Sequence, residues 1–157
     1  MFEKRGALAM GAAFLVLALG AGAGGDVEQH AKGTFEVKLT PVTDNSAASA
    51  RMSSVKTYSG DLIGTSKGDM WTTESGVKGS AGYVAIEKFE GTLDGKHGTF
   101  TLMHHATMRR GGDFQIRIVV VPESGTGELA GLSGTMTMGE KGFHSYTLDY
   151  TIAQTSR

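Results

Sequence analysis

Apolar and polar residues alternate in short runs along most of this chain, as in strands that bury one face. The clearest two runs lie between residues 80 and 108, on either side of the turn-rich segment 93–98. A hairpin loop of two residues (94–95) or four residues (94–97) would place matching positions of both runs on one face. These inward residues are Tyr83, Ala85, Glu87 and Phe89 in the first run and Phe100, Leu102, His104 and Ala106 in the second.

Further alternating runs predict strands at 34–39, 55–66, 67–73, 114–121, 132–138 and 144–153. Pro41 is expected to end the first strand, and segment 43–52 is expected to be a loop or a short helical turn. Gly60 and Gly64 predict bends of the kind a closing barrel needs. About eight short strands with tight connections favour an all-β antiparallel up-and-down barrel. The interior of such a barrel just accommodates side chains or one small ligand.

The composition fits this fold and excludes several function classes. A chain of 157 residues is long enough for one domain, and 24 glycines against 2 prolines suit tight turns. The net charge of −1 provides no basic surface for nucleic acid. The absence of cysteine excludes disulfides, thiolate metal sites and a cysteine nucleophile.

The N-terminus resembles a secretory signal peptide. Lys4 and Arg5 precede an apolar stretch at 7–19, and Ala21-Gly22-Ala23 offers a cleavage site. The alternative is an uncleaved anchor, since segment 6–25 carries no charge. The expected organisation is therefore a signal peptide at 1–23, a flexible lead-in at 24–33 and a barrel domain at 34–153. The mature protein is expected to be exported, with no membrane segment after cleavage.

Glu87 and His104 are the strongest catalytic candidates because they place a carboxylate and an imidazole on an otherwise apolar face. A two-residue loop makes them diagonal neighbours, and a four-residue loop makes them directly opposed. Burial would raise the pKa of the carboxyl, and the imidazole would offset the cost of burying it. The pair could act as a base with its orienting group, or hold the polar tip of a ligand. Alternatively, it only secures the barrel register.

Aromatic side chains are candidates for lining a ligand pocket, although in a small barrel such residues more often form the core. Trp71 and Tyr83 are preferred because each carries a polar donor that needs a partner when buried. The other candidates for ligand binding are Phe100, Tyr58 and Tyr150.

No cofactor or metal is expected. His104 and His105 are adjacent on a strand and point to opposite faces, so they cannot easily bind one ion together. The glycine-rich segment 125–131 lacks the spacing of a phosphate-binding loop and the helix that would follow it. No G-x-S-x-G elbow occurs, so a serine hydrolase of that kind has no support.

Five segments carry a family resemblance, namely 30–39, 54–69, 82–104, 122–134 and 146–150. Together they resemble a bacterial family of unknown function with an allene-oxide-cyclase-like β-barrel, in a superfamily that includes the plant dirigent proteins. Members of that superfamily hold hydrophobic ligands in the barrel, steer cyclisation or coupling, and often form oligomers. The plant cyclase relies partly on a cysteine, which this chain lacks.

Two functions of different classes follow from these observations. The first is an exported barrel that binds a hydrophobic small molecule, with isomerase- or cyclase-type activity and homo-oligomer formation implied by the resemblance alone. The alternative is a non-catalytic secreted or envelope protein whose barrel is filled by its own side chains. Whether the protein is an enzyme is left open by the residues.

Overall fold

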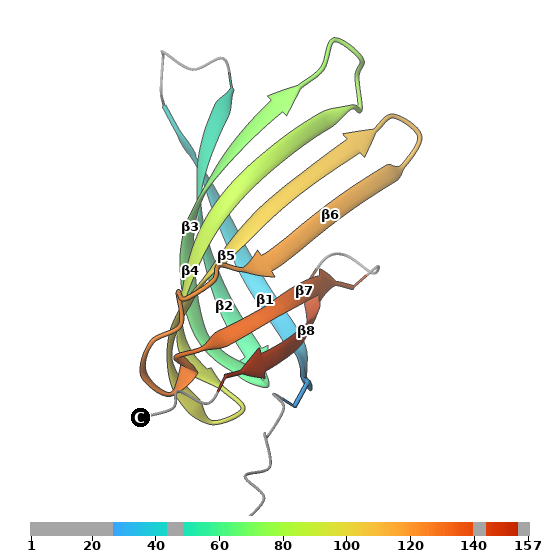
Figure 1. Cartoon of the computed structure of the whole chain (residues 1–157). Helices are drawn as coiled ribbons and strands as arrows, with labels where there is room; N and C mark the ends of the chain where they lie inside the picture. Colours follow the sequence, from blue (N-terminus) through green and yellow to red (C-terminus); the bar gives the residue numbers. More distant parts are fainter. Residues whose placement is uncertain (1–26, 44–48, 140–143, 154–157) are drawn as a thin grey trace, which may run out of the picture.

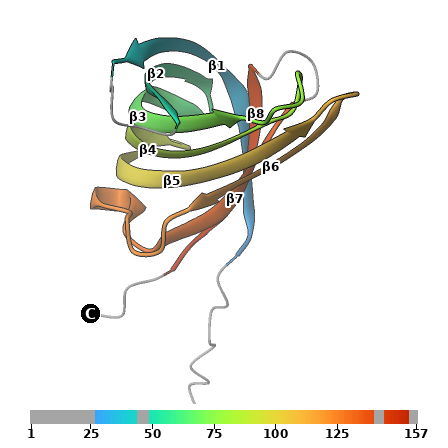
Figure 2. The same ribbon diagram turned by 90° about the horizontal axis from the view of Figure 1, so that it is seen from above.

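Each strand of this chain pairs with its neighbours in sequence, and the last strand closes on the first (Figures 1 and 2). The computed structural model describes residues 27–43, 49–139 and 144–153, so the expected signal peptide lies outside the described residues. The strands are β1 (Gln29–Val42), β2 (Ala50–Gly60), β3 (Leu62–Glu74), β4 (Ala81–Leu93), β5 (Lys96–Arg109), β6 (Asp113–Val120), β7 (Leu132–Met138) and β8 (Ser145–Ile152). The predicted eight-stranded antiparallel barrel is thus confirmed.

Helical structure is minor in the described ranges. A single 3-10 turn, η1 (Gly127–Leu129), interrupts the connection between β6 and β7. Within these ranges, no helix has the length and apolar character needed to cross a membrane.

The β4–β5 hairpin has the shorter of the two expected loops. Leu93 pairs with Lys96, which leaves Asp94 and Gly95 as the turn. Both turn residues have positive φ, 48° and 78°, as a type I′ hairpin requires. The register then places Glu87 opposite Leu102 and leaves it diagonal to His104, as the two-residue alternative predicts.

The expected single strand at 55–66 is wrong, because the chain reverses in the middle of it. β2 ends at Gly60, which has a φ of 110°, and β3 runs without a break from Leu62 to Glu74. A Cβ at position 60 would lie 2.6 Å from the carbonyl oxygen of Lys32, so only glycine fits this turn. The Asp61 carboxylate accepts the Lys32 N–H at 2.8 Å and thereby ties the turn to β1.

β1 is longer at both ends than the expected strand. It begins at Gln29, inside the expected lead-in, because residues 29–34 pair with β8. It also continues through Pro41 to Val42. Pro41 lies beyond the segment that pairs with β8, where β1 is an edge strand, and edge strands tolerate proline.

Side chains fill one end of the barrel. Tyr58, Phe89, Phe100 and Tyr146 form an aromatic chain, with ring centroids 5.6 Å apart for Tyr58–Phe89, 4.9 Å for Phe89–Phe100 and 5.6 Å for Tyr58–Tyr146. Leu129 of η1 is fully buried against the same cluster. This end therefore has a self-filled core.

The other end of the barrel is less completely walled. β6 pairs with β7 only through Ile118 and Val119, and β1 pairs with β8 only through residues 29–34. Segments 113–117 of β6 and 35–42 of β1 thus lack a strand partner on that side among the described residues. Figure 1 shows β4, β5 and β6 rising beyond the short strands β7 and β8. This unequal pairing makes one end of the barrel open.

Candidate functional site

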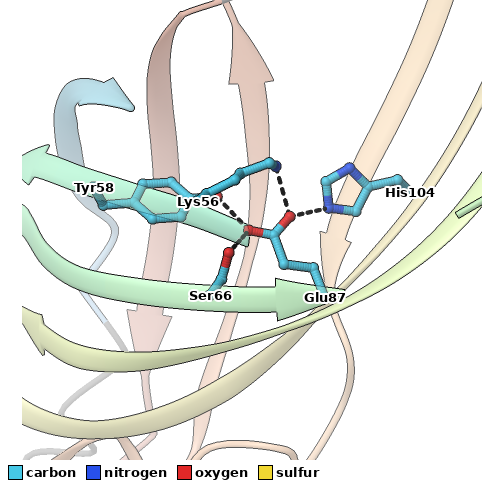
Figure 3. Close-up of polar contacts among 5 residues, drawn as sticks. All are labelled: Lys56, Tyr58, Ser66, Glu87 and His104. Atoms are coloured by element: carbon cyan, nitrogen blue, oxygen red, sulfur yellow. Dashed lines mark hydrogen bonds and ion pairs between the residues drawn. The ribbon is translucent and has the colours of Figure 1, made fainter. Parts of the chain in front are cut away.

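Five polar side chains meet on the inner wall of the barrel, as Figure 3 shows. They are Lys56 and Tyr58 from β2, Ser66 from β3, Glu87 from β4 and His104 from β5. Each belongs to the inward set of its strand, because residues two apart on a strand share a face. All five are less than a tenth exposed, and Glu87 is only 2% exposed.

The Glu87 carboxylate is the centre of this cluster. Its Oε1 accepts hydrogen bonds from the hydroxyls of Tyr58, at 2.6 Å, and of Ser66. Its Oε2 accepts a hydrogen bond from Lys56 Nζ at 2.6 Å. His104 Nε2 lies 3.0 Å from the same Oε2 without an aligned hydrogen bond to it. The cluster thus surrounds both oxygens.

The charges around Glu87 decide its protonation state. Burial alone would raise the pKa of the Glu87 carboxyl, but the His104 imidazole and the Lys56 ammonium outweigh burial and hold that pKa well below its usual range. The expectation of a raised pKa is therefore wrong in its net direction, because it did not include Lys56. Burial and the nearby Glu87 charge raise the pKa of the Tyr58 hydroxyl, so Tyr58 stays a donor.

A cavity of about 350 Å³ begins at this cluster and occupies the open end of the barrel. The cluster contributes Lys56, Glu87 and His104 to its wall. Most of the remaining wall is apolar, and the other lining residues are Phe35, Val37, Leu39, Ser54, Met70, Tyr83, Ala85, Met138 and His144. Val37 and Leu39 are 37% and 46% exposed although they line the cavity.

The structure brings together only part of the predicted pocket. Tyr83 lines the cavity, and Tyr58 contacts Glu87 from the side of the packed core. Phe100 and Tyr150 lie within the self-filled core instead, with exposures of 0% and 1%. The Tyr150 hydroxyl donates to Asp94 Oδ2 at 2.5 Å, on the turn of the β4–β5 hairpin.

Trp71 does not belong to the site. Trp71 pairs with Val84 on β4, and paired residues share a face of the sheet. Because the inward residues of β4 are the odd-numbered ones, Val84 and Trp71 both lie on the outer face, and Trp71 is 39% exposed. The Arg51 guanidinium lies 5.4 Å from the ring centroid and provides a cation–π contact. The preference for Trp71 rested on residue type, whereas its strand parity places it outside.

Lys56 and Ser66 are the members of the site that the sequence interpretation missed. Lys56 is two residues before Tyr58, which was already expected to point inward, so the same alternation identifies it. Ser66 follows Leu62 and Gly64 at even spacing and shares their face. The even spacing between Tyr58 and Ser66 gives the same signal, even with segment 55–66 treated as one strand.

The site has no features of a metal centre. Across the described residues, no group of three or more His, Cys, Asp and Glu side chains is placed to hold an ion. His105 lies on the outer face of β5, opposite to its neighbour His104, and is exposed. The cluster is instead a carboxylate held by hydroxyl, ammonium and imidazole groups.

Comparison with known proteins finds a family and a solved structure that are both described as of unknown function. Residues 31–150 match a family described as "Protein of unknown function (DUF3224)". A crystal structure of a DUF3224 protein with unknown function, from Shewanella oneidensis MR-1, is 40% identical in sequence and has a TM-score of 0.75. The match covers 82% of this chain and 99% of that one. No curated protein matches significantly. The expected family of unknown function is confirmed, and the allene-oxide-cyclase-like assignment stays a prediction.

Proposed function

We propose that this chain, which belongs to the DUF3224 family of proteins of unknown function, binds an apolar small molecule with one polar end inside its barrel. The observation that carries the proposal is the cavity of about 350 Å³ that reaches Glu87 and His104. Ligand sites are typically clefts of about 300–1,000 Å³, mostly apolar and with a few convergent polar groups. The cavity matches this description in size and in lining.

The apolar wall of the cavity favours a ligand over a self-filled interior. Val37 and Leu39 line the cavity and leave more than a third of their surface uncovered. At the opposite end, inward residues such as Leu62 and Leu93 are fully buried. Covering the exposed apolar surface would be favourable by roughly 25 cal/mol per Å². A hydrophobic ligand body in the open end would provide that cover.

The polar cluster suits binding better than proton transfer by Glu87. A general base needs an accessible lone pair and a pKa near the working pH. Both Glu87 oxygens already have two partners each, and its carboxyl pKa is held low. We therefore assign Glu87 to positioning Lys56 and Tyr58. The isomerase- or cyclase-type reaction implied by the resemblance has no base in Glu87.

Calorimetric titration with octanol tests the proposal, because octanol is an apolar molecule with one neutral polar end. Octanol is expected to bind the wild-type chain. Ala85→Phe, which places a ring inside the cavity, should abolish binding while the protein stays folded by circular dichroism. Val84→Phe is the matched control, because Val84 is the neighbouring residue on the outer face. Equal binding by both variants, or no binding to the wild type, would favour the alternative of a structural protein with a non-binding barrel.

Export of the barrel domain is part of this proposal. It is supported by the basic residues Lys4 and Arg5, the apolar stretch at 7–19 and the small residues before Gly24. N-terminal sequencing of protein recovered outside the cytoplasm should find a start near Gly24, whereas an intact Met1 would indicate an anchor.

A further inference from the structure

We propose that the ligand is an apolar monocarboxylic acid, whose head group lies between Lys56 and His104 and whose binding brings one proton into the site. This inference rests on the proposed function and specifies the class of ligand. It follows from counting which donors and acceptors of the polar cluster are already used and which face the cavity without a partner.

Glu87 has no capacity left for a ligand. An ionised carboxylate offers about four lone-pair sites on its two oxygens. Oε1 receives the hydroxyls of Tyr58 and Ser66, and Oε2 receives Lys56 Nζ and the contact with His104. A ligand donor would therefore have to displace one of these groups. The groups available to a ligand are the ones that surround Glu87.

Lys56 is the first available group. Its ammonium has three N–H donors, and Glu87 is the one acceptor it reaches among the described residues. The residue is only 8% exposed, so little water compensates the other two donors. Nζ lies 4.9 Å from the ring centroid of Phe35, which also lines the cavity. A ligand oxygen at this point would receive a charge-assisted hydrogen bond.

His104 is the second available group. Its Nε2 is buried, and although it lies 3.0 Å from Glu87 Oε2, it makes no aligned hydrogen bond to that oxygen or to any other described residue. Figure 3 shows the Lys56 ammonium and the His104 ring meeting at Glu87 Oε2, each from its own direction. A head group with two oxygens beside Oε2 can meet both.

The charge balance of the polar cluster predicts that one proton is taken up when the ligand binds. Without ligand, Lys56 and Glu87 form a neutral pair. A bound carboxylate would add one negative charge in a site of low dielectric, beside an existing carboxylate, and this is unfavourable unless a proton enters as well. The imidazole of His104 is the nearest group of a type that changes charge near neutral pH.

Other titratable groups face the same space as His104. Glu87 lies on β4 and Lys56 on β2, and together they are the neutral pair. Tyr83, also on β4, has a pKa raised by burial and by the Glu87 charge, so it stays protonated. His144, which precedes β8, lines the same cavity and is the one competing imidazole in the described part of its wall.

The apolar wall excludes more highly charged ligands. Val37, Leu39, Met70 and Met138 line the space above the cluster and provide no partner for a second charge. A diacid or a phosphate would bring a second negative charge, whereas the cluster has one cation that is already paired. One carboxylate on a hydrocarbon body satisfies both the polar cluster and the wall.

The test compares octanoate with octanol by calorimetric titration of the full chain at pH 7, in buffers of different ionisation enthalpy. Octanoate is expected to bind at least about tenfold more tightly than octanol, which corresponds to one charge-assisted hydrogen bond. The dependence of the heat on the buffer should show the uptake of about one proton per octanoate bound and none for octanol.

Four variants locate the two interactions. The double variant Lys56→Met/Glu87→Gln removes the ion pair without leaving a lone charge, and it should bind octanol and lose the preference for octanoate. His104→Gln should abolish proton uptake, whereas His105→Gln on the outer face should retain it. Loss of uptake in His144→Gln with retention in His104→Gln would overturn the assignment to His104.

The outcomes separate this inference from the proposed function. Octanol binding as tightly as octanoate, or octanoate binding without proton uptake, would overturn the assignment of the ligand as a carboxylic acid. The proposal of an apolar ligand site would still stand. No binding of either molecule would overturn both.

Discussion

The Lys56 ammonium lies 2.6 Å from Glu87 Oε2 on the inner wall of the barrel, where the self-filled end meets the open end. Lys56 lies on β2 and Glu87 on β4, and β3 lies between these two strands in the sheet. The two side chains therefore meet over β3. Tyr58 belongs to the packed core and touches the same carboxylate. The ion pair thus lies between a core that contributes stability and a cavity that we propose contributes function.

Glu87→Gln should destabilise the protein because it leaves the Lys56 ammonium buried without a counter-ion. Removing one partner of a buried ion pair typically costs about 3–5 kcal/mol of unfolding free energy. Lys56→Met/Glu87→Gln should recover part of that loss, because no lone charge remains. Urea unfolding of the wild type, of Glu87→Gln, of Lys56→Met and of the double variant measures the effect. Glu90→Gln, on the outer face of β4, is the control. Equal stability of Glu87→Gln and wild type would contradict a buried charge pair.

The depressed pKa of Glu87 predicts a specific loss of stability in acid. In the unfolded chain a Glu carboxyl binds its proton near pH 4.3, about the reference value. In the folded chain the pKa of Glu87 is lower, so this group contributes stability that is full above that pH. The contribution is lost as the pH falls toward the folded pKa.

The unfolding free energy of the wild type should therefore decrease from about pH 5 to about pH 3, in line with such a shift. In Glu87→Gln the decrease over the same range should be smaller, because the titrating group is gone. Urea unfolding at several pH values measures both slopes. Parallel slopes would show that other carboxyl groups cause the acid sensitivity.

Gly91→Ala should destabilise the barrel because β3 and β4 approach closely at this position. Gly91 pairs with Gly64 and has a φ of 154°. A Cβ on Gly91 would lie 2.2 Å from the carbonyl oxygen of Ile63, which is far inside normal contact. We expect a loss of more than about 2 kcal/mol, from backbone strain and overlap together.

Thermal or urea unfolding of Gly91→Ala measures this loss. Gly76→Ala is the matched control, because a Cβ there would have no atom within 4 Å. An unchanged stability of Gly91→Ala would mean that the strands can separate at this point without cost.

Strand alternation was sufficient to predict the barrel and the inward positions of Glu87 and His104. The period of two is a local property, and it holds wherever one face is buried. The hairpin turn at Asp94 and Gly95 carried its own signal in the sequence. Trp71 was misplaced because residue type was given more weight than alternation, which puts its neighbour Met70 inside the cavity.

Which end of the barrel is filled could not be predicted from the sequence. That property depends on how far the strand pairs extend, above all on β6 meeting β7 through only Ile118 and Val119 and on β1 meeting the distant β8 through only residues 29–34. The Lys56–Glu87 contact likewise joins residues on strands that are not adjacent, and no local pattern specifies its distance.

The most direct measurement of the central claim is the methyl NMR spectrum of the methionines during titration with octanol. Met70 and Met138 line the cavity, whereas Met103 lies on the outer face and is 45% exposed. We predict that the resonances of Met70 and Met138 shift with saturation while that of Met103 stays in place. Unchanged Met70 and Met138 resonances, or equal shifts of all three, would contradict a ligand site inside the barrel.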